Sequence, residues 1–294
     1  MKNIRIQALL LTIAIIWGLT ACSTTRLRRE GTVQTEAYNC KLQFSTIKTL
    51  IILPVEINGA TKNFLFDTGA EVTVLQKDTI VGNTTTITGA TNRSMKLGHE
   101  TIRSLKIGEI EFRDTHAMSG NLVGLKEQIP NFGGIIGQPI ISKTNWLINY
   151  TDSTIVLSNQ QLADSTFTPI KIKRKRGKPY ASLSIDGDKQ MALIDLGSSS
   201  ALAIPEGSAQ ARQILSKYSF HEKEREIYTI GGLRNTKEKT GIIPSVILDD
   251  VGFREMAASI RPTSQLRIGN SFFKKQLVII DNINHIIHIK PIRP

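Results

Sequence analysis

Cysteine, histidine and aromatic residues are scarce in this 294-residue chain, which has two cysteines and five histidines. Two cysteines allow at most one disulfide, so the sequence excludes a small fold held together by several disulfides. The histidines are spread along the chain and form no cluster with the spacing of metal ligands. We therefore expect no metal site and no cofactor.

Long hydrophobic runs are also rare, and the main one, Ala8–Trp17, is too short for a comfortable membrane span. Lys2 and Arg5 precede this run, and a Leu-Thr-Ala-Cys motif ending at Cys22 follows it. The arrangement resembles the signal of bacterial lipoproteins, which is cut before a cysteine that then carries lipid. We predict a signal peptide over residues 1–21, lipidation of Cys22, and anchoring to a membrane of the bacterial cell envelope. That location is the periplasmic face of the inner or outer membrane, or the cell surface. An ordinary secretory signal with an incidental cysteine is the alternative.

Acidic residues are too few to balance the basic ones, and the formal net charge is +12. Aromatic side chains make up 6% of the chain and are not interleaved with the basic residues, so we expect no nucleic-acid partner. Much of the excess charge lies in residues 166–178, which we interpret as a solvated linker between two lobes. Attraction to anionic phospholipid or lipopolysaccharide is the alternative for this segment.

Two short turn motifs are the most informative features that are present. One is Asp-Thr-Gly-Ala at residues 67–70, and the other is Asp-Leu-Gly-Ser at residues 195–198. Each lies between two apolar runs that are typical of strands. Two carboxylates that face each other can share one proton and activate a water molecule.

The similarity between the two halves extends well beyond these turns. Ile57-Asn58-Gly59 precedes Asp67 at the distance at which Ile185-Asp186-Gly187 precedes Asp195, and the later Ile136-Gly137 corresponds to Ile268-Gly269. Several ordered matches at nearly constant offset indicate an internal duplication, with lobes of about 120 residues each.

Short β-type runs separated by turn residues fill most of the chain. The runs that we predict as strands are Leu50–Ile57, Phe64–Phe66, Val72–Leu75, Leu105–Phe112, Thr154–Leu157, Ser182–Ile185 and Ile286–Ile289. Helix signals are few: we expect one helix over Pro205–Tyr218, opened by the proline, and short helices after Gly137 and Gly269. The pattern predicts an all-β protein.

The motif Phe66-Asp67-Thr68-Gly69-Ala70, the later Gly134-Ile135-Ile136-Gly137 and the second copies of both resemble the aspartic proteases, of the retropepsin-like and pepsin-like kind. The resemblance implies two similar closed-barrel-like lobes with few short helices. The domain boundaries that we predict are a signal peptide at 1–21, a flexible tether at 22–40, a first lobe at 41–165, a basic linker at 166–178 and a second lobe at 179–294.

The resemblance also implies the residues of the site. Asp67 and Asp195 are the expected catalytic pair, and the residues expected to support their turns are Thr68, Gly69, Ala70, Gly197 and Ser198. The glycine-bearing segments where mobile flaps would fall contain Gly89, Ala90, Gly231 and Gly232. Two ordinary surface hairpins are the alternative there.

Two residues depart from the family pattern. The family has Thr or Ser at the position of Leu196, where the hydroxyl braces one turn against the other. Arg267 interrupts the second apolar-Gly motif, Leu266-Arg267-Ile268-Gly269. Both departures favour a protein that keeps the fold without turnover.

The sequence therefore predicts a monomeric, lipid-anchored aspartic endopeptidase that hydrolyses peptides or proteins with a water molecule activated between Asp67 and Asp195. A catalytically inactive peptide-binding or scaffold lipoprotein is the alternative. A dimer that pairs the first lobes of two chains is a third possibility, disfavoured because Asp195 is present.

Overall fold

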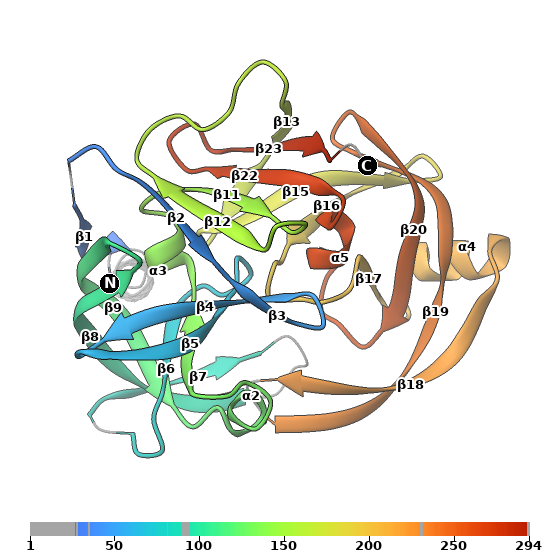
Figure 1. Cartoon of the computed structure of the whole chain (residues 1–294). Coiled ribbons are helices and arrows are strands. Elements are labelled where there is room, and N and C mark those ends of the chain that lie inside the picture. The colour runs from blue at the N-terminus through green and yellow to red at the C-terminus, as the bar shows by residue number, and fades with distance from the viewer. Residues whose placement is uncertain are drawn as a thin grey trace, which may run out of the picture.

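The computed structural model describes residues 27, 29–34, 36–80, 82–89, 94–229 and 232–292. Two β lobes lie side by side, and a third sheet packs against both of them (Figure 1). The chain is therefore mostly β structure in two lobes, which confirms the predicted fold class.

The first lobe is built on a nine-stranded sheet. Its strands are β1 (Thr32–Val33), β3 (Ser45–Ile47), β4 (Leu50–Ile57), β5 (Ala60–Phe66), β6 (Thr73–Gln76), β7 (Thr84–Thr88), β8 (Ser94–Ile107), β9 (Ile110–Gly120) and β10 (Phe132–Ile136). Pairing runs from β4 through β5, β10, β6, β9 and β8 back to β4, which closes the sheet on itself. Closure leaves few free strand edges and encloses the apolar faces.

The second lobe repeats this arrangement on an eight-stranded sheet. Its strands are β14 (Lys173–Lys175), β15 (Lys178–Ile185), β16 (Asp188–Ile194), β17 (Leu202–Pro205), β18 (Phe220–Thr229), β19 (Gly232–Leu248), β20 (Val251–Arg261) and β21 (Arg267–Ile268). Here β15, β16, β21, β17, β20 and β19 close the corresponding ring, with parallel and antiparallel pairs in the same places. The duplication seen in the sequence is thus a duplication of topology.

The third sheet joins the lobes with strands from both halves of the chain. Its order is β13 (Thr168–Lys171), β23 (Ile286–Pro291), β22 (Gln276–Asp281), β11 (Asn145–Asn149), β12 (Thr154–Ser158) and β2 (Asn39–Gln43). The β11–β22 pair lies at its centre, and two further strands follow on each side. One predicted domain boundary, between residues 40 and 41, falls inside strand β2 of this sheet, and strand β13 lies within the predicted linker at 166–178.

The helices are short. They are α2 (Val123–Lys126), α3 (Gln138–Ile141), α4 (Ala209–Lys217) and α5 (Asn270–Phe273). The sequence predicts α3 and α5 correctly after Gly137 and Gly269. The helix expected over Pro205–Tyr218 is shorter, because Pro205 ends strand β17 and Ser208 caps α4 by accepting a hydrogen bond from the Ala211 amide.

One predicted strand is wrong in its extent. The apolar pattern from Leu105 to Phe112 is split between β8 and β9 by a turn at Gly108, whose φ is +58°. A positive φ favours glycine, so the chain reverses there and the two halves pair with each other.

Candidate active site

The two predicted turns leave equivalent strands of the two lobes. Asp67 follows β5, and its backbone N–H donates to the Ile136 carbonyl at 3.0 Å. Asp195 follows β16, and its backbone N–H donates to the Ile268 carbonyl at 2.8 Å. Each carboxylate is therefore positioned by a parallel neighbour strand, β10 in one lobe and β21 in the other.

The apolar-Gly motifs pack directly beneath the turns. A Cβ atom at Gly137 would lie 2.2 Å from the Val72 carbonyl oxygen, and one at Gly269 would lie 2.4 Å from that of Ser200. No side chain fits at such distances, so glycine is required at both places for the close approach of two backbones. The helices α3 and α5 begin immediately after these glycines.

Gly69 and Gly197 bring the turns together across the interface between the lobes. A Cβ at Gly69 would lie 2.7 Å from Asp195 Cγ, and a Cβ at Gly197 would lie 2.2 Å from Asp67 Cγ. Neither glycine is among the residues with positive φ in the described part of the chain. The turns therefore do not need glycine for a positive φ, and each glycine instead leaves room for the carboxyl group of the opposite turn.

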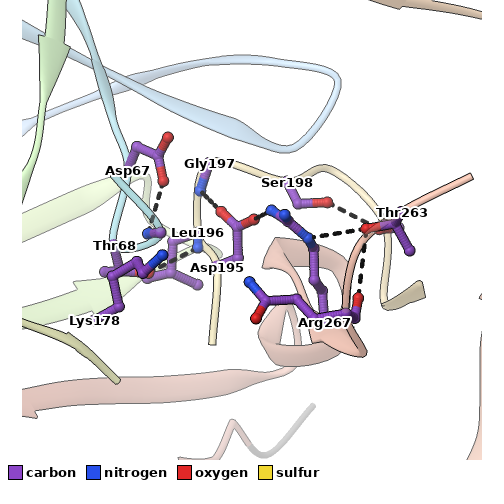
Figure 2. Close-up of polar contacts among 12 residues, drawn as sticks. Asp67, Thr68, Lys178, Asp195, Leu196, Gly197, Ser198, Thr263 and Arg267 are labelled. Atoms are coloured by element: carbon purple, nitrogen blue, oxygen red, sulfur yellow. Dashed lines mark hydrogen bonds and ion pairs between the residues drawn. The ribbon is translucent and has the colours of Figure 1, made fainter. Parts of the chain in front are cut away.

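Thr68 braces the two turns from the first lobe. Its buried hydroxyl donates to the Ile194 carbonyl at 2.7 Å and accepts from the Leu196 N–H at 2.9 Å (Figure 2). Leu196 occupies the equivalent place in the second lobe, is 1% exposed and packs in the main hydrophobic core. The brace is thus made by one hydroxyl, and the opposite position contributes apolar packing.

Burial and the neighbouring carboxylate raise the pKa of Asp67 well above its ordinary value. Desolvation is the largest cause, followed by the charge of Asp195 and a hydrogen bond with it, while the Gly69 N–H and Arg267 oppose the rise. The Gly69 N–H donates to Asp67 Oδ1 at 2.8 Å. The two carboxyl groups therefore interact directly, and the proton of the pair is favoured on Asp67.

Arg267 holds the other carboxylate. Its Nη1 lies 2.5 Å from Asp195 Oδ2, and the Gly197 N–H donates to Asp195 Oδ1 at 3.1 Å. Arg267 approaches Asp195 from the side away from Asp67 (Figure 2), and its Nε donates to Thr263 at 3.2 Å. The side chains of Arg267 and Asp195 are 11% and 6% exposed, so this is a largely buried ion pair.

The residues after the two glycines differ between the turns. Ala70 carries no polar group, and the next residue, Glu71, pairs with Lys178 at 2.8 Å. The Ser198 hydroxyl lies 2.9 Å from Ser200 Oγ and 3.4 Å from an Arg261 nitrogen. Lys178 belongs to the segment interpreted as a basic linker, and it thus contacts the first turn specifically.

The flap candidates lie at the tips of equivalent hairpins, β7–β8 and β18–β19. Gly89 directly follows β7, and Gly232 is the first residue of β19. Ala90 and Gly231 lie outside the described residues. The β18–β19 hairpin reaches helix α2 of the first lobe (Figure 1), so it spans from one lobe to the other.

The predicted signal peptide, residues 1–21, and Cys22 lie outside the described residues. Within the described part, no helix is long and apolar enough to span a membrane. Cys40 is a free, half-buried cysteine on β2. No three histidine, cysteine, aspartate or glutamate side chains of the described chain are grouped so as to hold a metal ion.

Sequence reasoning recognised Arg267 only as a departure from a motif, and it missed Arg225, Glu238 and Arg261, which lie near Asp195 in the fold. These three residues come from long strands of mixed polar sequence that carry no recognisable motif. Arg267 is the one with a detectable signal, because a charged residue interrupts an apolar run.

The fold and the site together define an all-β protein of two duplicated lobes, with a pair of interacting carboxyl groups where the lobes meet. Residues 53–140 match the model of the aspartyl protease family. This stretch contains the Asp67 turn and the Gly137 motif beneath it, and it indicates a peptidase-type hydrolase in general terms. A comparison with curated proteins finds no significant match.

Proposed function

We propose that the protein is an aspartic endopeptidase in which Asp67 and Asp195 together activate a water molecule. The observation that carries the proposal is the direct interaction of these carboxyl groups on two facing turns. The family match over residues 53–140 is independent support.

The two aspartates have different roles in the proposed reaction. Asp67 holds the shared proton and donates a hydrogen bond to the carbonyl oxygen of the scissile peptide bond. Asp195, which is paired with Arg267, accepts a proton from water as the water oxygen bonds to the carbonyl carbon. The tetrahedral adduct then collapses: the C=O bond re-forms, the C–N bond breaks, and the leaving nitrogen takes up the proton that Asp195 accepted from water. A carboxylate offers about four lone-pair sites, so Asp195 retains acceptor capacity beside Arg267 and Gly197.

The raised pKa of Asp67 sets the direction of the pH dependence. Hydrolysis requires the protonated form of Asp67, so activity falls as pH rises through that raised pKa. Activity therefore persists to higher pH than it would with an ordinary carboxyl group, whose pKa is 3.8.

Incubation of the mature chain with a diverse peptide mixture tests this function by mass spectrometry of the products. We expect Asp67→Asn and Asp195→Asn to abolish cleavage while the far-ultraviolet circular dichroism stays unchanged. Asp114→Asn is the matched control, because Asp114 is exposed and its φ of 48° suits asparagine. Full activity of either dyad variant would contradict the mechanism.

A catalytically inactive peptide-binding protein is the second candidate, and the Arg267–Asp195 contact favours it. An oxygen that accepts a hydrogen bond from a guanidinium group is less available to accept a proton from water. Peptide binding by the wild type without any cleavage over the whole pH range would support this candidate.

We also propose that lipid on Cys22 anchors the protein to a membrane of the bacterial cell envelope. The support is the charged, apolar and Leu-Thr-Ala-Cys segments in residues 1–22. Each buried methylene of an acyl chain would contribute about 0.8 kcal/mol. Labelled palmitate should be incorporated into the wild type and Cys40→Ser but not into Cys22→Ser. If the wild type incorporates no label, the lipid anchor is wrong and the segment is an ordinary secretory signal.

A further inference from the structure

Three arginines gather beside Asp195, on strands that are far apart in the sequence. Arg225 comes from β18, Arg261 from the end of β20 and Arg267 from β21, while Glu238 on β19 lies among them. We call these four residues the arginine cluster. Only Arg267 contacts the carboxylate pair, so hydrolysis by itself does not explain the other two arginines.

Two of the three guanidinium groups are well bonded. Arg225 pairs with Glu238 Oε1 at 3.3 Å and donates to Ser199 Oγ at 2.7 Å. Arg267 holds Asp195 and Thr263, as described above. Each of these groups has a short contact that fixes its orientation.

Arg261 is held much more weakly. Its closest acidic atom is Glu238 Oε2 at 3.9 Å, and its Nη2 lies 3.4 Å from Ser198 Oγ and 3.3 Å from Ser200 Oγ. Glu238 Oε2 is itself a buried oxygen without a hydrogen-bond partner in the described chain. Burial and the charge of nearby Arg225 lower the pKa of Arg261 to about 10. The guanidinium of Arg261 is therefore poorly compensated.

The charges of the cluster also show that acidic partners are too few. Three arginines face two acidic partners, Glu238 and Asp195, so one positive charge is in excess. Burying an uncompensated charge is costly, and a bound anion would remove that cost. The side chains of Arg225 and Arg261 are 25% and 12% exposed, which leaves them accessible to a ligand.

The cluster is also close to the reacting groups. The Ser198 hydroxyl, which Arg261 contacts, belongs to the residue after Gly197, and the backbone of Gly197 lies against Asp67. A substrate group bound at Arg261 would therefore lie within a few residues of the hydrolysed bond.

We propose that the arginine cluster is a carboxylate-binding subsite, so that the preferred substrates carry an acidic group on one side of the scissile peptide bond. The inference rests on the proposed function only in calling the bound peptides substrates, because binding itself does not require hydrolysis. The carboxylate replaces the missing acidic partner of Arg261, with Arg225 as its neighbour.

The first lobe shows why the preference is one-sided. Ile135 stands at the position of Arg267 and is 4% exposed in an apolar cluster. Glu71, at the position of Ser199, is already paired with Lys178 at 2.8 Å. Arg176 also lies 3.8 Å from Glu71, but its side chain is 69% exposed and its charge is solvated. Among the described residues, the first turn therefore has no buried surplus of positive charge like that of Arg261.

Binding of labelled octapeptides to the full-length Asp67→Asn protein tests the subsite. The peptides are otherwise randomised, acetylated and amidated, and they carry Glu or Gln at one fixed position, each position in turn. We expect Glu to bind about tenfold more tightly than Gln at one or two positions, as a charge-assisted hydrogen bond warrants. The preference should weaken at high salt. Gln peptides with a free C-terminal carboxylate reveal whether the chain end is the ligand instead.

Arg261→Gln and Arg225→Gln, made in the same protein, should each reduce the Glu preference, while Arg261→Lys should retain part of it. Arg254→Gln is the control, because Arg254 is exposed on the same strand as Arg261. Equal binding of Glu and Gln peptides at every position, or a preference that survives both variants in folded protein, would overturn the subsite. If Glu is preferred but the wild type cleaves nothing, the subsite stands and the proposed hydrolysis fails.

Discussion

The two lobes share a topology but differ in chemistry beside the carboxylates, above all at the position of Ile135 and Arg267. In the first lobe, Ile135 pairs with Leu65 and Val74 and packs in an apolar cluster that includes residues near helix α2. In the second lobe, Arg267 occupies the same place between Leu193 and Ala203, and its guanidinium reaches Asp195.

This difference makes the carboxylate pair asymmetric. Asp67 has a pKa raised by burial and by the neighbouring carboxylate, whereas Asp195 forms an ion pair with the Arg267 guanidinium. In a symmetric pair the proton could lie on either side. Here the surroundings favour the proton on Asp67. The two aspartates therefore differ in chemistry although the lobes that carry them are duplicates. Exchanging features between the lobes should therefore have predictable effects.

Arg267→Ile, which makes the second lobe resemble the first, should have the largest effect. It leaves Asp195 buried beside Asp67 without its guanidinium partner, and breaking a buried pair in this way costs about 3–5 kcal/mol. Urea unfolding at neutral pH measures the loss. Asp195→Asn added to Arg267→Ile should recover most of the stability, because no uncompensated charge remains. An unchanged stability in the single variant would show that the ion pair is not formed in solution.

Thr68→Val removes the hydroxyl that braces both turns and should have the next largest effect. The Ile194 carbonyl and the Leu196 N–H each lose a partner, which we expect to cost about 2 kcal/mol. Peptidase activity should fall as well, because the spacing of the two carboxyl groups relaxes. Thr68→Ser retains the hydroxyl and should stay close to the wild type. Equal losses in both variants would assign the effect to packing.

Asp67→Asn should stabilise the fold at neutral pH. The folded protein favours protonated Asp67, so the stabilisation by this group is complete below its ordinary pKa of 3.8 and is lost as pH rises through the raised value. Asparagine resembles the protonated acid at every pH. Melting temperatures should therefore be higher in the variant at pH 7 and equal at pH 3. A variant less stable than the wild type at pH 7 contradicts the assignment of the proton.

Leu196→Thr, which gives the second lobe the hydroxyl of the first, should have the smallest effect. The lost apolar packing of a buried side chain, about 0.8 kcal/mol per methylene, is offset by about 1 kcal/mol for each new hydrogen bond. We expect a net change within about 1 kcal/mol and undiminished activity. Leu196→Ala is the comparison and should cost about 2–5 kcal/mol. Similar losses in the two variants would mean that the threonine hydroxyl finds no partner.

Local sequence determined much of the fold and the centre of the site. Strand β4 has the predicted bounds, because alternating and β-branched apolar residues between turn signals favour a strand. The Gly137 and Gly269 motifs predict the two short helices α3 and α5. The duplication itself is visible in the ordered repeats, so the pairing of Asp67 with Asp195 follows from the assumption that similar halves fold alike.

Tertiary structure alone decided what surrounds that pair. Arg267 lies far along the chain from Asp195, and the arginine cluster combines residues of four separate strands, which no local pattern brings together. Gly69 shows the same limit: the motif marks it as part of the turn, but only the structure shows that the opposite carboxyl group occupies the space of a Cβ there. Turn chemistry and periodicity act over a few residues and can be seen in a sequence. Charge compensation and close approach depend on which surfaces meet, and those are set only when both lobes have folded against each other.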